Sequence, residues 1–178
     1  MKIIISAHFD VARPVMSILM DKQKISGLID NLAGLFAAYE AGRKTGVPVY
    51  FTNFEEMGYE GAKSVAKGLD KKDTLVIVVD TCTDVKGKAA YIGNAYHLKT
   101  GGLKKEFKGK ILFKDGLFEE DMDETYVYGG KAGLKTFFFG IPISGEYHDT
   151  DNEVALKTVD RSAEVLIHVI QWLQRNPA

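Results

Sequence analysis

Acidic and imidazole side chains recur along this 178-residue chain at the points where short apolar runs end. They fall in five segments, which read AHFD at residues 7–10, GLIDN at 27–31, FEE at 54–56, VVD at 78–80 and EYHD at 146–149. Carboxylates that are brought together repel one another and lose hydration, so several of them would have to take up protons at neutral pH. A divalent metal ion removes that cost by supplying positive charge. The set therefore predicts a metal site, although any one of these acids alone is more typical of a helix cap.

The ligand types indicate which metal and which chemistry. Two histidines with several carboxylates suit zinc or a similar borderline metal better than magnesium. Adjacent side chains at a strand end point in opposite directions, so one of Glu55 and Glu56 can bind a metal while the other faces a water molecule. A carboxylate beside an activated water can take its proton and pass it to a leaving amine. The pattern fits metal-assisted hydrolysis.

Alternating strands and helices must position these residues. The run Ile3-Ile4-Ile5 predicts a strand buried on both faces. Asp30 and Gly46 stand where the N-cap and the C-terminal cap of a helix belong, and that helix carries apolar residues at helical spacing. The glycine pairs 101–102 and 129–130 are expected in turns. Apolar runs predict strands at 2–7, 47–54, 74–80, 89–94, 110–114 and 135–140, and helices are predicted at 31–45, 59–68 and 159–174.

This order predicts an α/β fold in which helices cover a largely parallel sheet, with residues 1–178 as a single domain. In such folds ligands bind beyond the carboxyl ends of the strands, where the five polar segments are expected to meet.

Composition excludes several classes of protein. Lys+Arg is 23 and Asp+Glu is 24, so the chain lacks the basic excess of a nucleic-acid-binding protein. A single cysteine excludes a disulfide framework and favours a reducing compartment. The first apolar run is too short for a signal peptide, and no apolar stretch is long enough to span a bilayer. We therefore expect a cytoplasmic protein that binds neither nucleic acid nor membrane.

The order of the motifs resembles that of the co-catalytic dizinc exopeptidases, which include leucyl-type, deblocking and glutamyl aminopeptidases. The motifs that carry the resemblance are His-x-Asp at 8–10, Asp-Asn at 30–31, Glu-Glu-x-Gly-x-x-Gly at 55–61, Asp80 and His148. The resemblance extends to about residue 153. It implies a three-layer α/β sandwich with a mostly parallel mixed sheet, the phosphorylase/hydrolase-like zinc exopeptidase core. Residues 11–29 are too few for an inserted domain, so a minimal version without a lid or dimerisation domain is expected.

The resemblance also implies a ligand set for two divalent metal ions, with zinc expected and cobalt or manganese as alternatives. By this resemblance, His8 and Asp80 would bind the first ion, and Glu56 and His148 would bind the second. Asp30 would bridge the two.

The same resemblance implies roles for the neighbouring residues. Glu55 would act as general base and then as general acid, and Asp10 would orient the ring of His8. Tyr147, next to the second histidine, is a candidate for substrate contact, with packing as the alternative. Arg13 is the one arginine expected to reach the site.

We therefore expect a zinc-dependent aminopeptidase that acts on short peptides and could form a homo-oligomer. A carboxypeptidase or small-amide deacylase using the same site is the enzymatic alternative. A non-catalytic metal-binding member of the fold is the alternative from another class.

Other residues with chemical potential are expected to be structural. Cys82 is predicted to be a buried thiol, and His168 lies on the polar side of its helix, exposed to solvent. His97 has no spacing relation to the polar set. The acidic residues of the segment 119–124 are predicted to form an exposed first turn of a helix.

Overall fold

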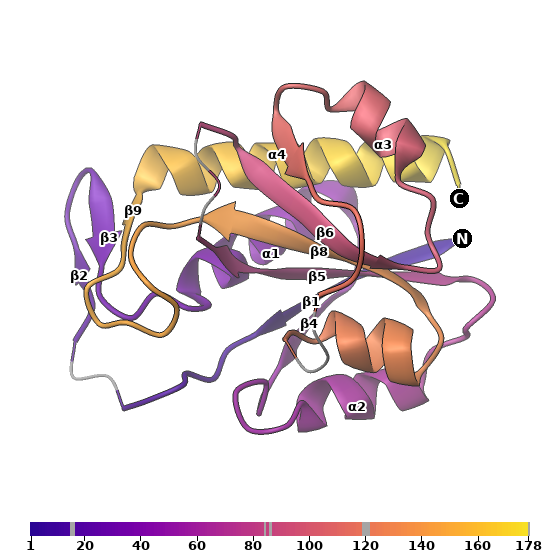
Figure 1. Cartoon of the computed structure of the whole chain (residues 1–178), viewed down its shortest axis with the longest axis horizontal. Coiled ribbons are helices and arrows are strands. Elements are labelled where there is room, and N and C mark those ends of the chain that lie inside the picture. Colours follow the sequence, from indigo (N-terminus) through magenta and orange to yellow (C-terminus); the bar gives the residue numbers. More distant parts are fainter. Residues whose placement is uncertain (15–16, 84, 86, 119–121, 178) are drawn as a thin grey trace.

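A six-stranded mixed sheet forms the centre of the computed structural model, which describes residues 1–14, 17–83, 85, 87–118 and 122–177 (Figure 1). The strand order is β4-β1-β5-β8-β6-β7. The first four run parallel, β6 is antiparallel to β8, and β7 is parallel to β6. The strands are β1 (Lys2–His8), β4 (Val49–Thr52), β5 (Thr74–Cys82), β6 (Ala90–Tyr96), β7 (Ile111–Phe113) and β8 (Lys135–Pro142).

Helices cover both faces of this sheet and complete three layers (Figure 1). One face is covered by α1 (Leu32–Thr45), α3 (Gly101–Glu106) and α4 (Leu156–Arg175). The other face is covered by α2 (Glu60–Lys67) and by η1 (Tyr126–Lys131), a π-helix. The predicted α/β sandwich with a mostly parallel mixed sheet is confirmed. No helix among the described residues has both the length and the apolar character needed to cross a membrane.

The central strands are buried on both faces, as predicted. In β1, Ile3 and Ile5 face the α1/α4 layer, whereas Ile4 faces the α2/η1 layer. The same alternation places the side chains of Ser6 and His8 toward the α2/η1 layer. The face of the sheet that carries the site is therefore set by the pleat of β1.

The predicted helix at residues 31–45 is confirmed, and Gly46 caps it in the left-handed conformation with φ 73°. Its packing face differs from the one that large apolar residues would form, because Phe36 and Tyr39 are exposed while Ala37 and Ala41 are fully buried. Small side chains allow α1 to approach both the sheet and α4 closely. The long helix α4 instead buries the stripe that its sequence spacing predicts.

Several short elements give no sequence signal. A second sheet, in the order β2-β3-β9, joins β2 (Leu19–Met20), β3 (Lys24–Ser26) and β9 (Glu153–Ala155). These strands are too short for a detectable period of two.

The expectation that both glycine pairs lie in turns is wrong, since one pair begins α3 and the other lies within η1. At position 129 a Cβ would lie 2.2 Å from the ring of Tyr96, so the absence of a side chain there permits close helix–sheet packing.

Candidate metal centre

The predicted site residues converge at the carboxyl-terminal edge of the parallel strands. His8 is the last residue of β1, and Asp80 lies near the end of the adjacent strand β5. Asp30 precedes α1, Glu56 lies in the turn after β4, and His148 lies in the loop between β8 and β9. Five separate connections thus contribute to one cluster, as parallel topology predicts.

His8 contacts two of the carboxylates. Its Nε2 atom lies 3.2 Å from Asp30 Oδ1 and 3.4 Å from Asp80 Oδ1, and the imidazole is 3% exposed. His8 and Asp80 continue the parallel pairing of β1 with β5 by two residues beyond the pair Ser6–Val78. Sheet register therefore places these two side chains next to each other.

His148 contacts the other side of the same cluster. Its Nε2 atom lies 3.3 Å from Glu56 Oε2 and 3.7 Å from Asp30 Oδ2. The two oxygens of Asp30 therefore face two different imidazoles. The structure brings together the two groups of residues expected for two ions, with Asp30 between them.

Asp30 does not cap α1, which corrects the expectation from sequence. The N-cap is Asn31, which makes no side-chain capping bond and donates from Nδ2 to the carbonyl of Val79 at 2.8 Å. The helix begins one residue later than expected because Asn31 is anchored to β5. The carboxylate of Asp30 is consequently directed into the site.

Asp10 fixes the Glu-Glu turn as well as the first histidine. Its two carboxylate oxygens accept the backbone N–H groups of Glu55 and Glu56 at 3.1 and 3.2 Å. Nδ1 of His8 lies 3.2 Å from the Asp10 carbonyl and 3.5 Å from its Oδ1. Asp10 can therefore orient the His8 ring, the role expected for it, while it also holds the turn.

The electrostatics of the cluster are those of crowded, buried acids. Burial, followed by the Asp30 charge, raises the pKa of Asp80. Burial, followed by the Asp80 charge, raises the pKa of Glu55 to about 9, and burial also raises the pKa of Glu56. Burial opposes ionisation of Asp30 and of His8, but the contact with His8 outweighs it for Asp30, and the charge of Asp80 together with the contact to Asp30 outweighs it for His8. The pKa of Asp30 is lowered, and that of His8, which also faces Asp80, is raised to about 12.

The residues present fit divalent metal ions. Glu56 Oε1 is buried without a hydrogen-bond partner in the described part of the chain, and the buried Asp30 Oδ1 has the imidazole of His8 beside it. His8, Asp30 and Glu56 each offer a ligand atom, and these atoms lie within 4.8 Å of one another. Imidazoles mixed with carboxylates form a donor set that zinc and neighbouring metals accept. Orphaned buried acceptors of this kind indicate a missing positive partner.

A cavity of about 920 Å³ opens over the cluster and gives room for a small peptide. Tyr147 lines it, half-exposed, with its hydroxyl 3.8 Å from Cys82 Sγ, so this residue both packs against Cys82 and faces the cavity. Arg13 is exposed and does not line this cavity, so the structure does not support its expected role. The acidic and imidazole lining residues are Asp30, Glu55, Glu56, Asp80, Asp123 and His148.

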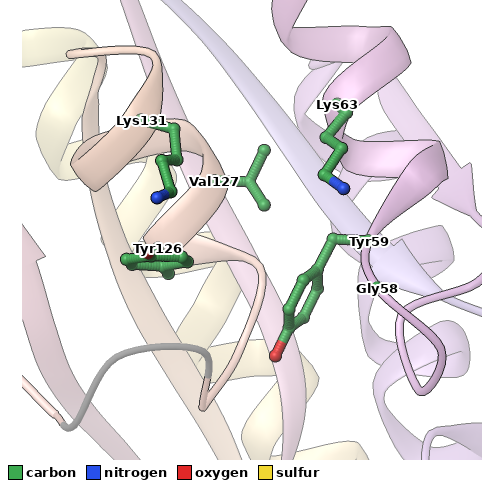
Figure 2. Close-up of a pocket in the computed structure, with 6 residues that line it drawn as sticks. All are labelled: Gly58, Tyr59, Lys63, Tyr126, Val127 and Lys131. Atoms are coloured by element: carbon green, nitrogen blue, oxygen red, sulfur yellow. The ribbon is translucent and has the colours of Figure 1, made fainter.

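A second cavity, of about 400 Å³, lies between α2 and η1 (Figure 2). Lys63 extends into it from α2, and Lys131 lies over the ring of Tyr126, 4.7 Å from its centroid (Figure 2). Its described lining includes no carboxylate and no imidazole. It therefore offers none of the groups that metal-assisted hydrolysis requires.

Two acids that sequence reasoning placed in solvent are buried. Asp123 and Glu124 are 2% and 1% exposed, which corrects the predicted exposed turn, while residues 119–121 lie outside the described part. Ser6 Oγ donates to Glu124 Oε2 at 2.6 Å and lies 2.9 Å from the hydroxyl of Tyr128. The sequence signal was Ser6 itself, a polar residue in a buried strand that requires a partner.

The remaining residues expected to be structural behave as predicted. Cys82 is buried and donates to the Thr83 carbonyl at 3.2 Å, and it also lines the cavity over the cluster. His97 and His168 are exposed and do not line the cavity over the cluster.

No protein-family model matches this sequence, and a comparison with curated protein sequences finds no match. Several solved structures of peptidases are similar. A TET1 peptidase of Pyrococcus horikoshii aligns with TM-score 0.63 and 20% identity over 86% of this chain and 52% of its own. An aminopeptidase from the archaeon Desulfurococcus kamchatkensis aligns with TM-score 0.61 and 17% identity over 91% of this chain and 54% of its own.

An M18-family aminopeptidase from Thermotoga maritima aligns with TM-score 0.59 and 12% identity, over 85% of this chain and 48% of its own. The chain thus spans about half the length of these structures. At such identities the likeness shows the fold, and it confirms at that level the resemblance to the exopeptidases that the motifs indicate.

Proposed function

We propose that this chain is a metal-dependent aminopeptidase that removes N-terminal residues from short peptides. One observation carries the proposal: Asp30 lies between two imidazoles, each of which also contacts a further carboxylate, at the floor of a peptide-sized cavity. The similar fold of the solved aminopeptidases supports it.

Two divalent ions, with zinc expected, would be held by five ligands. His8 and Asp80 would hold one ion, Glu56 and His148 the other, and Asp30 both. When bound, such ions polarise a carbonyl group and lower the pKa of water. Four of these ligands are largely buried, whereas the side chain of His148 is 43% exposed.

Glu55 would move the proton. Its carboxylate lines the same cavity, and it is not among the residues whose ligand atoms converge with those of His8 and Asp30. It would take a proton from the attacking water and deliver it to the amine that leaves. Asp10, which binds the backbone N–H of Glu55, positions it for both transfers.

The charge of the cavity favours an aminopeptidase over a carboxypeptidase. Its walls near the cluster are acidic, which suits a protonated α-amino group. Lys114 is the one cation among the described lining residues, apart from the imidazole of His148, and no arginine is found among them to pair with a substrate carboxylate.

The test compares aminoacyl anilides with N-acyl amino acids as substrates, using protein loaded with zinc. We expect turnover of the anilides, and Glu55→Gln should lower kcat by about 10²- to 10⁴-fold while the metal content is unchanged. Glu106→Gln, the same change at an exposed position, is the control. Turnover of only the N-acyl compounds would replace the aminopeptidase by a carboxypeptidase or deacylase. Binding of metal without turnover of either set would indicate a non-catalytic member of the fold.

We also propose that the chain acts as a homo-oligomer in the cytoplasm. The Pyrococcus horikoshii peptidase of similar fold can assemble into a tetrahedron or a large octahedral shell. Light scattering during gel filtration tests this, and a monomer at micromolar concentration would refute it.

A further inference from the structure

The cavity over the carboxylate cluster continues into an apolar chamber on the side away from Asp30. The wall of this chamber is made of three aromatic rings, and three aliphatic side chains stand at its rim. The residues that define it are Tyr91, Phe118, Phe138, Leu112, Leu117 and Met122.

Strand register fixes how far the chamber lies from the reaction centre. Asp80 on β5 pairs with Gly140 on β8, and Gly140 pairs with Tyr91 on β6. The chamber therefore begins two strands from Asp80, about 10 Å away at the usual strand spacing, and on the same face of the sheet. A large side chain that extends from a peptide bond over the cluster would cover much of that distance.

Between these two points the cavity is lined by Cys82 and Phe138, whose side chains pack over Gly140. A Cβ there would lie 2.6 Å from Cys82 Cβ and 2.8 Å from the ring of Phe138. Because Gly140 has no side chain, the side chains of Cys82 and Phe138 can pack against its backbone.

The rings pack tightly against one another and close the inner end of the chamber. Their centroids are 5.7–6.1 Å apart, and Tyr91 and Phe138 are only 7% and 6% exposed. Because buried rings close this chamber, it can accept the terminal residue of a peptide but not the middle of a longer chain.

The rim is exposed although it is apolar. Leu117 and Met122 are 56% and 59% exposed, and Leu112 is 38% exposed. Exposed apolar side chains that converge on one cavity indicate a ligand that covers them.

The charged groups at this end of the cavity are already engaged. The Lys114 ammonium lies over the ring of Phe118, 5.7 Å from its centroid. The Asp123 carboxylate accepts Asn94 Nδ2 at 3.0 Å and the Thr125 N–H at 2.6 Å. Among the residues that the structure describes, the chamber therefore presents no carboxylate without hydrogen-bond partners to a basic side chain.

We propose that this chamber receives the side chain of the N-terminal residue, so that the chain prefers peptides beginning with phenylalanine, leucine or another large apolar residue. The inference rests on the proposed aminopeptidase function, and it adds the substrate class.

Dipeptide hydrolysis by the zinc-loaded protein is the first test. We expect kcat/KM for Phe-Ala to exceed that for Ala-Ala by about 10- to 100-fold, the usual discrimination of an apolar pocket. Phe118→Ala should lower this ratio several-fold, and Phe36→Ala, the same change on the exposed side of α1, should not alter it. Preference for Glu-Ala or Lys-Ala, or a ratio that Phe118→Ala leaves unaltered, would overturn the inference.

Ligand binding tests the chamber without catalysis. Calorimetry should show tighter binding of L-phenylalanine than of L-alanine, and Phe118→Ala should remove most of the difference. If no dipeptide is hydrolysed but this selectivity is present, the proposed function fails and the chamber assignment stands. Equal binding of the two amino acids overturns the chamber assignment, whatever the activity.

Discussion

Removing the bound metal should destabilise the folded protein enough to be measured as a fall in Tm. The cluster brings several buried carboxylates together, and an ion that binds them only in the folded state stabilises that state. At about 100 times its dissociation constant, one ion contributes about 2.7 kcal/mol. For a chain of this length each kcal/mol shifts Tm by about 2–4 °C, so one ion should raise Tm by about 5–11 °C.

The position of Asp30 between the two imidazoles predicts how the zinc-dependent rise in Tm differs among variants. In the proposed arrangement, Glu56→Gln would remove a ligand of one ion only, whereas Asp30→Asn would remove a ligand that both ions share. We expect the zinc-dependent rise in Tm to be largest in the wild type, smaller in Glu56→Gln and smallest in Asp30→Asn. Glu106→Gln, an exposed control, should behave as the wild type.

The direction in which the stability of the metal-free protein changes with pH is a second prediction. In the metal-free protein, burial and the charge of Asp80 raise the pKa of Glu55 to about 9, so the folded state holds a proton that the unfolded state releases near pH 4.3. Metal-free stability should therefore fall as pH rises between these two values. Zinc binds deprotonated ligands, and burial also raises the pKa of the proposed ligands Asp80 and Glu56, so the gain in Tm on adding zinc should increase as pH rises.

Differential scanning fluorimetry with and without chelator, from pH 5 to 9, measures both effects. A melting temperature that is insensitive to zinc and chelator at every pH would refute the metal assignment. An equal zinc response in Asp30→Asn and in wild type would refute the bridging role.

Three further outcomes follow from contacts outside the ligand set. Ser6→Ala leaves the buried Glu124 carboxylate without its donor and should cost about 1–3 kcal/mol in urea unfolding, while Ser64→Ala on the exposed face of α2 should cost less than about 0.5. Asp10→Asn weakens both N–H contacts to the Glu-Glu turn, so metal affinity or kcat should fall about 10- to 100-fold with little change in Tm; an unaltered kcat and affinity would contradict the positioning role. Ala37→Leu should destabilise the fold by about 1–3 kcal/mol, and a neutral result in thermal unfolding would contradict the close packing of α1.

The sequence was sufficient to predict the residues of the cluster that end apolar strands. His8 and Asp80 follow runs whose burial is evident, and a parallel sheet brings such ends together. Their direct contact was not predictable, because it depends on the register of β1 against β5.

The rest depends on tertiary contacts that leave no local pattern. Glu124 lies beside Ser6 although the two are far apart in the chain, and its acidic neighbourhood resembles an exposed turn. The burial of Ala37 in place of Phe36 is decided by how closely α4 packs against α1, which helical spacing alone does not reveal.

The three-stranded sheet predicts that the segments carrying Asp30 and His148 unfold locally together. β3 leads directly to Asp30, β9 follows the loop that carries His148, and the two strands are hydrogen-bonded to each other. The N–H of Gly27 also donates to the carbonyl of Asn152 at 2.9 Å. Segments that contact opposite sides of the centre therefore belong to one cooperative opening unit, and their amide protons should exchange with a common protection factor. The entropy of arranging Asp30 and His148 is lost during folding, so an arriving ligand does not have to order them.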